Sequence, residues 1–310
     1  MALMSVLARG LVSGLAASAM AASPEGETKA APDVATVAIP AAGQTLRIGG
    51  DLKIEIGRRG ESGGSAEDVR FTCEGVNTID TPLPVGYPDP TPPGAIDLKM
   101  YPSVRRAQVS GETSRGREGM NEGFWPLFRH IQRREIAMTS PVEMEYRPGE
   151  GSIAEADNAD VAKTESASGG VTKPKNDSSA SNEKWTMAFL YRRAEQGATG
   201  DDPKDARVTI VDVPAQLVVS MGMKGDYSRE LVARGETTLR EWLATQGRFE
   251  AAGEARVLYY HGPSFRPWRK WAEVQIPIRE RAAKAQGIES ALVPANASEK
   301  PIPPAAPSPR

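Results

Sequence analysis

The stretch from Phe124 to Tyr146, FWPLFRHIQRREIAMTSPVEMEY, predicts a short amphipathic helix that leads into a strand. Its apolar residues recur at i, i+3, i+4 and i+7, which places them on one face of a helix. These residues are Phe124, Leu127, Phe128 and Ile131. We expect Pro126 in the first turn, where its missing N–H costs no hydrogen bond, with Asn121 or Gly123 as the cap.

The second part of this stretch has the period of a strand. Val142, Met144 and Tyr146 alternate with Glu143 and Glu145, so one face should be buried and the other solvated. The two glutamates could serve as a carboxylate pair, but a solvated strand face is the better explanation.

Composition excludes several classes of protein. The chain has 310 residues, a formal net charge of −2 and a pI of about 5.9, whereas a duplex-binding protein would be strongly basic. One cysteine, Cys73, allows no internal disulfide, and its alternation with Val69 and Phe71 makes it an expected core residue. Two histidines argue against an all-histidine metal site.

The N-terminus has the order of a secretory signal. Arg9 precedes an apolar segment that ends in Ala19-Met20-Ala21, as export signals do before a small-residue cleavage site. The segment is too short and too broken by Gly and Ser for a membrane span, and a flexible Ala-rich terminus is the alternative. We therefore expect residues 1–22 to be a signal peptide and the protein to be periplasmic or secreted, with no transmembrane span after cleavage.

Composition also divides the remaining chain. Residues 23–44 are expected to be a disordered linker, and residues 45–94 an N-terminal β extension with a hairpin around Gly49-Gly50-Asp51 and a proline-rich linker. The main domain is expected over 95–282, interrupted by a disordered loop at 147–184, and residues 283–310 are expected to be a disordered tail.

Within that domain, the order of elements suggests two similar halves. Strands are expected over 96–112, 185–191, 208–221, 256–260 and 273–278, and a second helix over 228–245. Each helix is preceded and followed by strands. The segment Ala107-Gln108-Val109-Ser110 before the first helix is similar to Ala215-Gln216-Leu217-Val218-Val219-Ser220 before the second. We predict an α+β domain of two strand-helix-strand units.

Several motifs, in order, resemble the SOUL haem-binding protein family. They include Ile136-Ala137-Met138-Thr139-Ser140-Pro141-Val142, the Trp185–Leu190 strand, Val211-Asp212-Val213-Pro214-Ala215, and Tyr260 through Pro267 into Glu273-Val274-Gln275-Ile276. The resemblance covers roughly residues 96–278. It implies a distorted β-barrel of two pseudo-repeated halves, each with a helix packed on the sheet, similar to gyrase-inhibitor-like effector-binding domains.

The resemblance also implies a non-covalent haem or other tetrapyrrole as ligand. Such a disc needs an apolar wall and cations at its carboxylate edge. Carried over by motif, the cations are Arg129 and Arg266 and the wall residues are Phe124 and Trp125. The alternative is that both arginines are merely solvated and that the apolar stripe of the helix serves the core.

No axial iron ligand can be named from the sequence. His130 is interpreted as a packing or surface residue, and His261 could be a ligand only if its loop folds over the site. Met138 and Met144 are interpreted as core fillers.

Catalytic motifs such as H-E-x-x-H and C-x-x-C do not occur in the sequence, and we expect no enzyme. Three hypotheses follow: a carrier or buffer of tetrapyrroles, a small-molecule or protein-interaction module without haem, and an enzyme that removes metal from tetrapyrroles. We expect no nucleic-acid partner.

Overall fold

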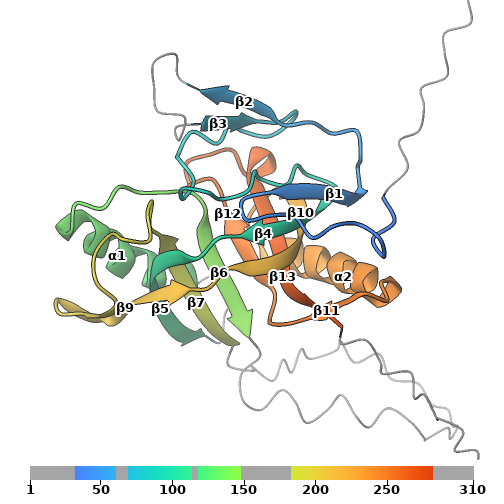
Figure 1. Cartoon of the computed structure of the whole chain (residues 1–310). Helices are drawn as coiled ribbons and strands as arrows, with labels where there is room; N and C mark the ends of the chain where they lie inside the picture. The colour runs from blue at the N-terminus through green and yellow to red at the C-terminus, as the bar shows by residue number, and fades with distance from the viewer. Residues whose placement is uncertain (1–31, 61–68, 114–117, 148–182, 282–310) are drawn as a thin grey trace, which may run out of the picture.

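The computed structural model describes residues 32–60, 69–113, 118–147 and 183–281 (Figure 1). The expected signal peptide, the loop interior and the tail lie outside these residues. The main sheet is antiparallel and its hydrogen-bonded order is β1-β4-β10-β13-β12-β6-β7-β5-β9-β8, with β11 paired to β13. Within the described residues no ladder joins β1 to β8, so the expected closed barrel is not found.

The bounds of the sheet strands are β1 Thr45–Gly50, β4 Ala95–Tyr101, β5 Val104–Thr113, β6 Val142–Arg147, β7 Glu183–Leu190, β8 Gly200–Asp202, β9 Asp205–Val213, β10 Gln216–Lys224, β11 Phe249–Ala251, β12 Arg256–Tyr259 and β13 Trp271–Glu280. The remaining elements are the pair β2 Gly57–Gly60 and β3 Val69–Thr72, the helices α1 Glu118–Arg133 and α2 Arg229–Thr245, and the 3₁₀ turn η2 Pro267–Arg269. The α+β class is confirmed.

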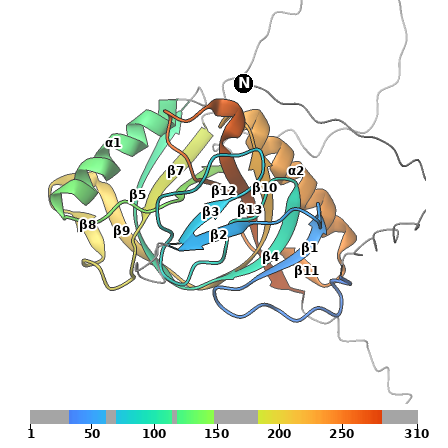
Figure 2. The same cartoon turned by 90° about the horizontal axis from the view of Figure 1, so that it is seen from above.

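The two faces of the sheet have different coverings. Figure 2 shows α1 and α2 on one side of the sheet and the β2–β3 pair on the other. The helix side holds the main core, in which Leu127 and Ile131 of α1 and Leu239 of α2 meet the strands. Alternation along β13 explains the division, because Ala272, Val274 and Ile276 face the helices while the residues between them face the other side.

The second helix forms as predicted. Ser228 caps it, and its side-chain hydroxyl accepts a hydrogen bond from the backbone N–H of Leu231 at 3.2 Å. Gly235, in the middle of α2, permits close packing, because a Cβ there would lie 2.6 Å from Cγ2 of Val274. The glycine thus brings α2 against β13.

The first helix begins earlier than predicted. It starts at Glu118, so Pro126 lies inside it rather than in its first turn. The additional turns pack on β7 through Gly123, where a Cβ would lie 2.9 Å from Cβ of Met187. We infer that this tertiary contact offsets the hydrogen bond that Pro126 cannot donate.

The predicted hairpin around Gly49-Gly50-Asp51 is wrong. β1 pairs with β4, with Leu46 opposite Leu98, and the chain turns away after Asp51, whose carboxylate accepts from the backbone N–H groups of Lys53 and Ile54. A Cβ added to Gly50 would lie 2.2 Å from the carbonyl oxygen of Gly94, and the φ of Gly50 is +65°. Only glycine therefore fits there.

Residues expected to be linker also enter the fold. Val34 is buried in the main core, and Arg248 donates to the backbone carbonyl of Val37.

On the far side of the sheet, Phe71, Val76, Ile79 and Leu83 form a second apolar cluster with residues of β10, β12 and β13. Cys73 is only half-buried, at the margin of this cluster, and burial raises the pKa of its thiol.

The face of the sheet under this second cluster also carries buried polar and charged side chains, which the sequence did not predict. Glu143, expected on a solvated face, is 3% exposed. It forms ion pairs with Arg106 and, at 3.6 Å, with Arg256. The expectation was wrong because residues 69–94, which are distant in sequence, cover this side of the sheet.

The centre of that face is a buried ion pair. Nζ of Lys99 lies 2.8 Å from Oε2 of Glu273, and both side chains are fully buried. Glu273 also accepts from Ser220, from Tyr260 and from the backbone N–H of Thr91. Thr91 belongs to the proline-rich segment, so this segment is part of the packed structure.

In the part of the chain that the structure describes, neither helix is long and apolar enough to cross a membrane.

Candidate functional site

A tyrosine-lined cavity of about 190 Å³ lies between the starts of the two helices. We call it the tyrosine pocket. Its lining comes from α1, from the ends of the adjacent central strands β6 and β12, and from the residues that open α2. The lining residues are Met120, Tyr146, Tyr227, Ser228, Arg229, Glu230 and Tyr259.

The pocket walls are held by ring and charge contacts. The rings of Tyr227 and Tyr259 stack with centroids 4.1 Å apart, and the guanidinium carbon of Arg229 lies 3.7 Å from the ring centroid of Tyr146. Arg229 also forms an ion pair with Glu183 of β7. Arg229 therefore places a positive charge against the aromatic wall of the pocket.

The phenols of the pocket are neutral at physiological pH. Burial raises the pKa of Tyr227 and that of Tyr259. Burial also raises the pKa of Tyr146, although a hydrogen bond with Tyr259 and the charge of Arg229 act in the opposite direction. The pocket therefore offers aromatic faces and hydroxyl groups, with Arg229 as its cation.

The two predicted wall residues lie together on α1. The rings of Phe124 and Trp125 meet edge to face with centroids 5.5 Å apart, and Phe124 stacks on Phe128. Trp125 is 53% exposed. Met120 of the tyrosine pocket and Phe124 are four residues apart on one helix, so their side chains lie on the same face of α1.

The two predicted cations lie on different parts of the fold. Arg129 is exposed on α1, and its charge helps to lower the pKa of Asp205, for which the bond from Arg207 is the main cause. Arg266 is exposed in the β12–β13 loop, at the N-cap of η2. Among the described residues no contact brings these two arginines together, and their proposed role stays a prediction.

Both histidines are engaged in structural hydrogen bonds. His130 is fully buried, with Nδ1 2.5 Å from Oδ2 of Asp202 and Nε2 2.7 Å from the hydroxyl of Tyr191, which confirms its interpretation as a packing residue. In His261, Nδ1 accepts from the backbone N–H of Trp271, so the proton lies on Nε2, which donates to the carbonyl of Thr78. Burial lowers the pKa of His261, and the ring is neutral.

The two methionines considered as iron ligands belong to the core. Met144 is fully buried, and Met138 is partly buried against the same cluster, as predicted. No cluster of His, Cys, Asp and Glu suited to a metal ion occurs among the described residues.

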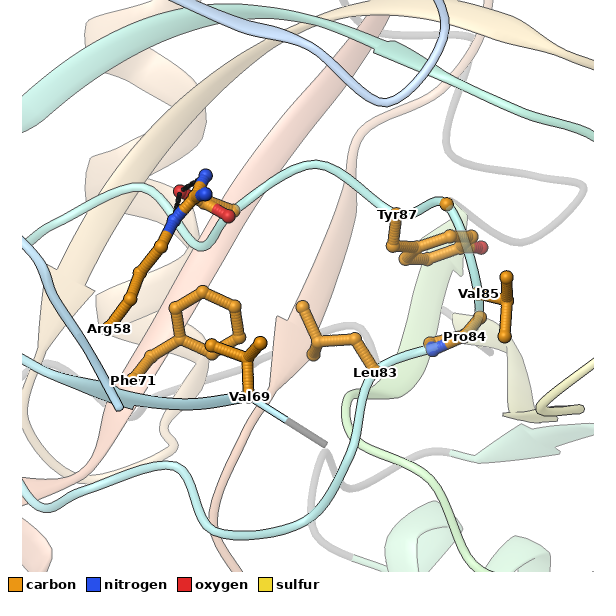
Figure 3. A pocket seen from close by; sticks show the side chains of 9 residues that line it. Arg58, Val69, Phe71, Leu83, Pro84, Val85 and Tyr87 are labelled. Atoms are coloured by element: carbon orange, nitrogen blue, oxygen red, sulfur yellow. Dashed lines mark hydrogen bonds and ion pairs between the residues drawn. The ribbon is translucent and has the colours of Figure 1, made fainter. Parts of the chain in front are cut away.

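A second cavity, of about 200 Å³, lies on the opposite side of the sheet. Figure 3 shows its apolar wall of Val69, Phe71, Leu83 and Tyr87, with Arg58 at one end. Nε of Arg58 donates to Oδ2 of Asp89 at 2.7 Å. Because this cavity lies on the side of the sheet opposite α1, which carries Phe124 and Trp125, the tyrosine pocket is the better candidate.

Residues 91–277 match the model of the SOUL heme-binding protein family. The chain belongs to this family. The match covers more than half of the 310 residues and confirms the family that the sequence motifs predicted. The tyrosine pocket of this SOUL protein is built within the matched region, since its residues run from Met120 to Tyr259.

Similar solved structures are distant. The chain in the EcmrR–DNA complex has 12% identity and a TM-score of 0.42, with 60% of this chain and 57% of that chain covered. The EcmrR C-terminal domain has 12% identity and a TM-score of 0.41, with 60% and 98% covered. A hydrolase from Listeria innocua has 12% identity and a TM-score of 0.40, with 62% and 94% covered. No curated protein matches the chain.

Sequence reasoning missed the pocket tyrosines and Arg229. Tyr227 and Arg229 flank the cap of the predicted second helix, and Tyr146 and Tyr259 lie at strand ends. Nothing in their local pattern marks them, because they meet only when β6 pairs with β12.

Proposed function

We propose that this SOUL protein binds haem or another tetrapyrrole non-covalently and carries or buffers it. Membership of the SOUL family supports this function. The observation that carries the site is that α1 lines the tyrosine pocket through Met120 and, one turn later, presents Phe124 and the exposed ring of Trp125. A flat apolar ligand would stack there and bring its carboxylate edge to Arg229.

The size of the pocket limits how such a ligand would lie. Pockets that enclose drug-sized ligands have volumes of about 300–1,000 Å³, whereas the tyrosine pocket has about 190 Å³. Only one edge of a tetrapyrrole would enter it, while the ring would rest against Phe124 and Trp125. We therefore expect a shallow, reversible site.

The residues suit the ring and its carboxylates better than they suit histidine ligation of an iron. Arg229 can donate to a carboxylate, and the hydrogen-bonded pair of Tyr146 and Tyr259 keeps one O–H that can donate to a ligand. The hydroxyl of Tyr227 is already engaged by His261 and Trp271. Both histidines use their ring nitrogens in the fold. The iron, when a haem is bound, supplies redox and axial-ligand chemistry for which we assign no residue.

A module that binds another small molecule is the alternative function. The small volume of the tyrosine pocket favours it, because a ligand of one or two rings would be enclosed there. A search with fragments of that size would separate it from tetrapyrrole binding.

We also infer that the sheet is built from two repeats. Outward from β6 the order is β7, β5 and β9, and outward from β12 it is β13, β10 and β4. The two orders correspond when β4, β5, β6 and β7 are matched with β9, β10, β12 and β13. Each unit then has the chain order strand, strand, helix, strand, strand, with α1 matched to α2. Superposition of one unit on the other in an experimental structure should place α1 on α2.

Haemin titration of the purified full chain tests the proposed function. We expect a saturable change of the Soret band, and at least tenfold weaker binding in the double variant Trp125→Ser/Arg229→Gln, because it loses both a stacking surface and a charged hydrogen bond. Arg129→Ala/Arg266→Ala tests the two cations that the SOUL resemblance implies. Arg207→Gln is a matched control, since Arg207 is exposed and paired with Asp205 away from the pocket.

Two results would contradict this proposal. The first is the absence of a saturable Soret change in the wild-type protein. The second is wild-type affinity in Trp125→Ser/Arg229→Gln, provided that circular dichroism shows the variant to be folded.

We also propose that the protein is exported from the cytoplasm to the periplasm or the exterior. The order of charged, apolar and small residues in 1–22 supports it. N-terminal sequencing of protein recovered from outside the cytoplasm would identify the cleavage site, whereas an uncleaved chain confined to the cytoplasm would contradict export.

A further inference from the structure

The loop between β12 and β13 exposes two large aromatic side chains beside two arginines. Residues 262–269 have the sequence Gly-Pro-Ser-Phe-Arg-Pro-Trp-Arg, and all eight are exposed. Phe265 is 38% exposed and Trp268 is 64% exposed, the most exposed large apolar residue among those described. We call this segment the aromatic loop. Solvent exposure of such rings is unfavourable unless they have a partner.

The charge of the aromatic loop is positive. Arg266 and Arg269 lie within it, and it contains no acidic residue. Two acidic groups at the base of the loop are already paired: Asp226 lies 3.6 Å from Lys270, and Asp80, which acts on His261, lies 3.9 Å from Arg70. This local excess of positive charge contrasts with the net charge of −2 of the whole chain, and it complements an anionic partner.

Backbone turns and its base hold the aromatic loop in one shape. The backbone N–H groups of Arg269 and Lys270 donate to the carbonyls of Arg266 and Pro267. At the base, the hydroxyl of Tyr227 accepts from the N–H of His261 and donates to the carbonyl of Trp271. The loop is therefore preorganised, and little conformational entropy is lost when its side chains bind.

The position of the aromatic loop suits docking on an extended surface. In Figures 1 and 2 the connection between β12 and β13 lies between the two helices, at one edge of the molecule. Tyr227 belongs both to the base of this loop and to the tyrosine pocket. A surface that receives the loop would therefore also lie close to the pocket.

From this combination we propose that the aromatic loop docks on an anionic lipid bilayer. Tryptophan and phenylalanine partition into the bilayer interface, and arginines attract anionic headgroups. A protein partner is less suitable, because a stable interface buries about 1,200–2,000 Å² and the loop contributes only eight residues. The proposal goes beyond tetrapyrrole binding and does not depend on it.

Vesicle binding of the full chain, without added tetrapyrrole, tests the proposal. We expect co-sedimentation with vesicles of phosphatidylcholine that contain about a third phosphatidylglycerol, and much weaker binding to pure phosphatidylcholine. Phe265→Ser/Trp268→Ser should lower the partition coefficient at least tenfold, since both rings are exposed and their removal leaves the core intact. Arg266→Gln should lower it about fivefold. A suitable control is Val85→Ser/Arg279→Gln, which removes an exposed apolar residue and an exposed arginine elsewhere.

Haemin titration and sedimentation separate this proposal from other roles of the loop. If Phe265→Ser/Trp268→Ser abolishes haemin binding while vesicle binding is unchanged, the loop belongs to the ligand site and the proposal is wrong. If the wild-type chain binds no vesicle, or if sedimentation shows a dimer that the same variant dissociates, the proposal is also overturned. Loss of vesicle binding with normal haemin affinity supports it.

Discussion

The buried pair of Lys99 and Glu273 allows a sharp prediction about stability. Both side chains are fully buried, and Nζ of Lys99 donates to Glu273 at 2.8 Å and to the carbonyl of Asp89 at 2.6 Å. Lys99→Met keeps the apolar stem but leaves the carboxylate without its cation. Because removal of one partner strands a buried charge, we expect a loss of about 3–5 kcal/mol in the free energy of unfolding at pH 7.

The loss should depend on pH in a defined direction. Burial is the largest single influence on Glu273 and would raise its pKa, but attraction to Lys99 and hydrogen bonds from Lys99, Ser220 and Tyr260 together outweigh it and lower the pKa. The native pair thus contributes stability above the unfolded pKa of about 4.3, and this stability is lost as pH falls through the lower folded pKa. In Lys99→Met burial dominates, so the pKa of Glu273 should rise. Proton uptake should then make the difference from wild type smaller at pH 5 than at pH 7.

Urea unfolding followed by tryptophan fluorescence at pH 7 and pH 5 measures both effects. Lys99→Met/Glu273→Gln is the matched control, because a neutral amide keeps acceptor capacity toward Ser220 and Thr91 without the stranded charge. We expect the double variant to be more stable than Lys99→Met. A loss below about 1 kcal/mol in the single variant, or an equal loss in both, would refute the reasoning.

Three further predictions concern α2 and His261. Gly235→Ala should lower the melting temperature, because the contact of its Cβ with Val274 at 2.6 Å costs about 1–3 kcal/mol, whereas alanine gains about 1 kcal/mol in helix propensity. Adding Val274→Ala should restore the melting temperature. A higher melting temperature for Gly235→Ala would contradict this packing. Ser228→Ala should cost about 1 kcal/mol while Ser228→Asp retains the cap, and equal denaturation midpoints for both variants would exclude it. Burial lowers the pKa of His261, so ¹⁵N NMR should show a neutral ring with its proton on Nε2 at pH 6.5. The contribution of His261 to the free energy of unfolding should decrease as pH falls below its unfolded pKa of about 6.5. A charged ring at pH 6.5 would disprove the assignment.

Local patterns predicted much of the secondary structure. The second helix, expected over 228–245, is found over Arg229–Thr245 with Ser228 as its cap, because helix caps and periodicity are properties of adjacent residues. Strands such as Glu183–Leu190 and Val142–Arg147 were predicted for the same reason. Ordered motifs also predicted the SOUL family, which the family match confirms.

Predictions failed where distant residues decide the local structure. Pro126 lies inside α1 because the preceding turns pack on β7, and the hairpin around Gly50 is replaced by pairing between β1 and β4. Glu143 is buried because the proline-rich segment and its neighbours cover that face of the sheet. A sequence pattern cannot show which face a remote segment will cover.

The candidate site divides in the same way. The sequence by itself determined the helix that carries Phe124 and Trp125, because spacing along one helix fixes which side chains are neighbours. Only the tertiary structure decided that Tyr146, Tyr259 and Arg229 form a pocket, and that His130 and His261 are fully hydrogen-bonded. These contacts join residues far apart along the chain, so they exist only after the central strands β6 and β12 have paired.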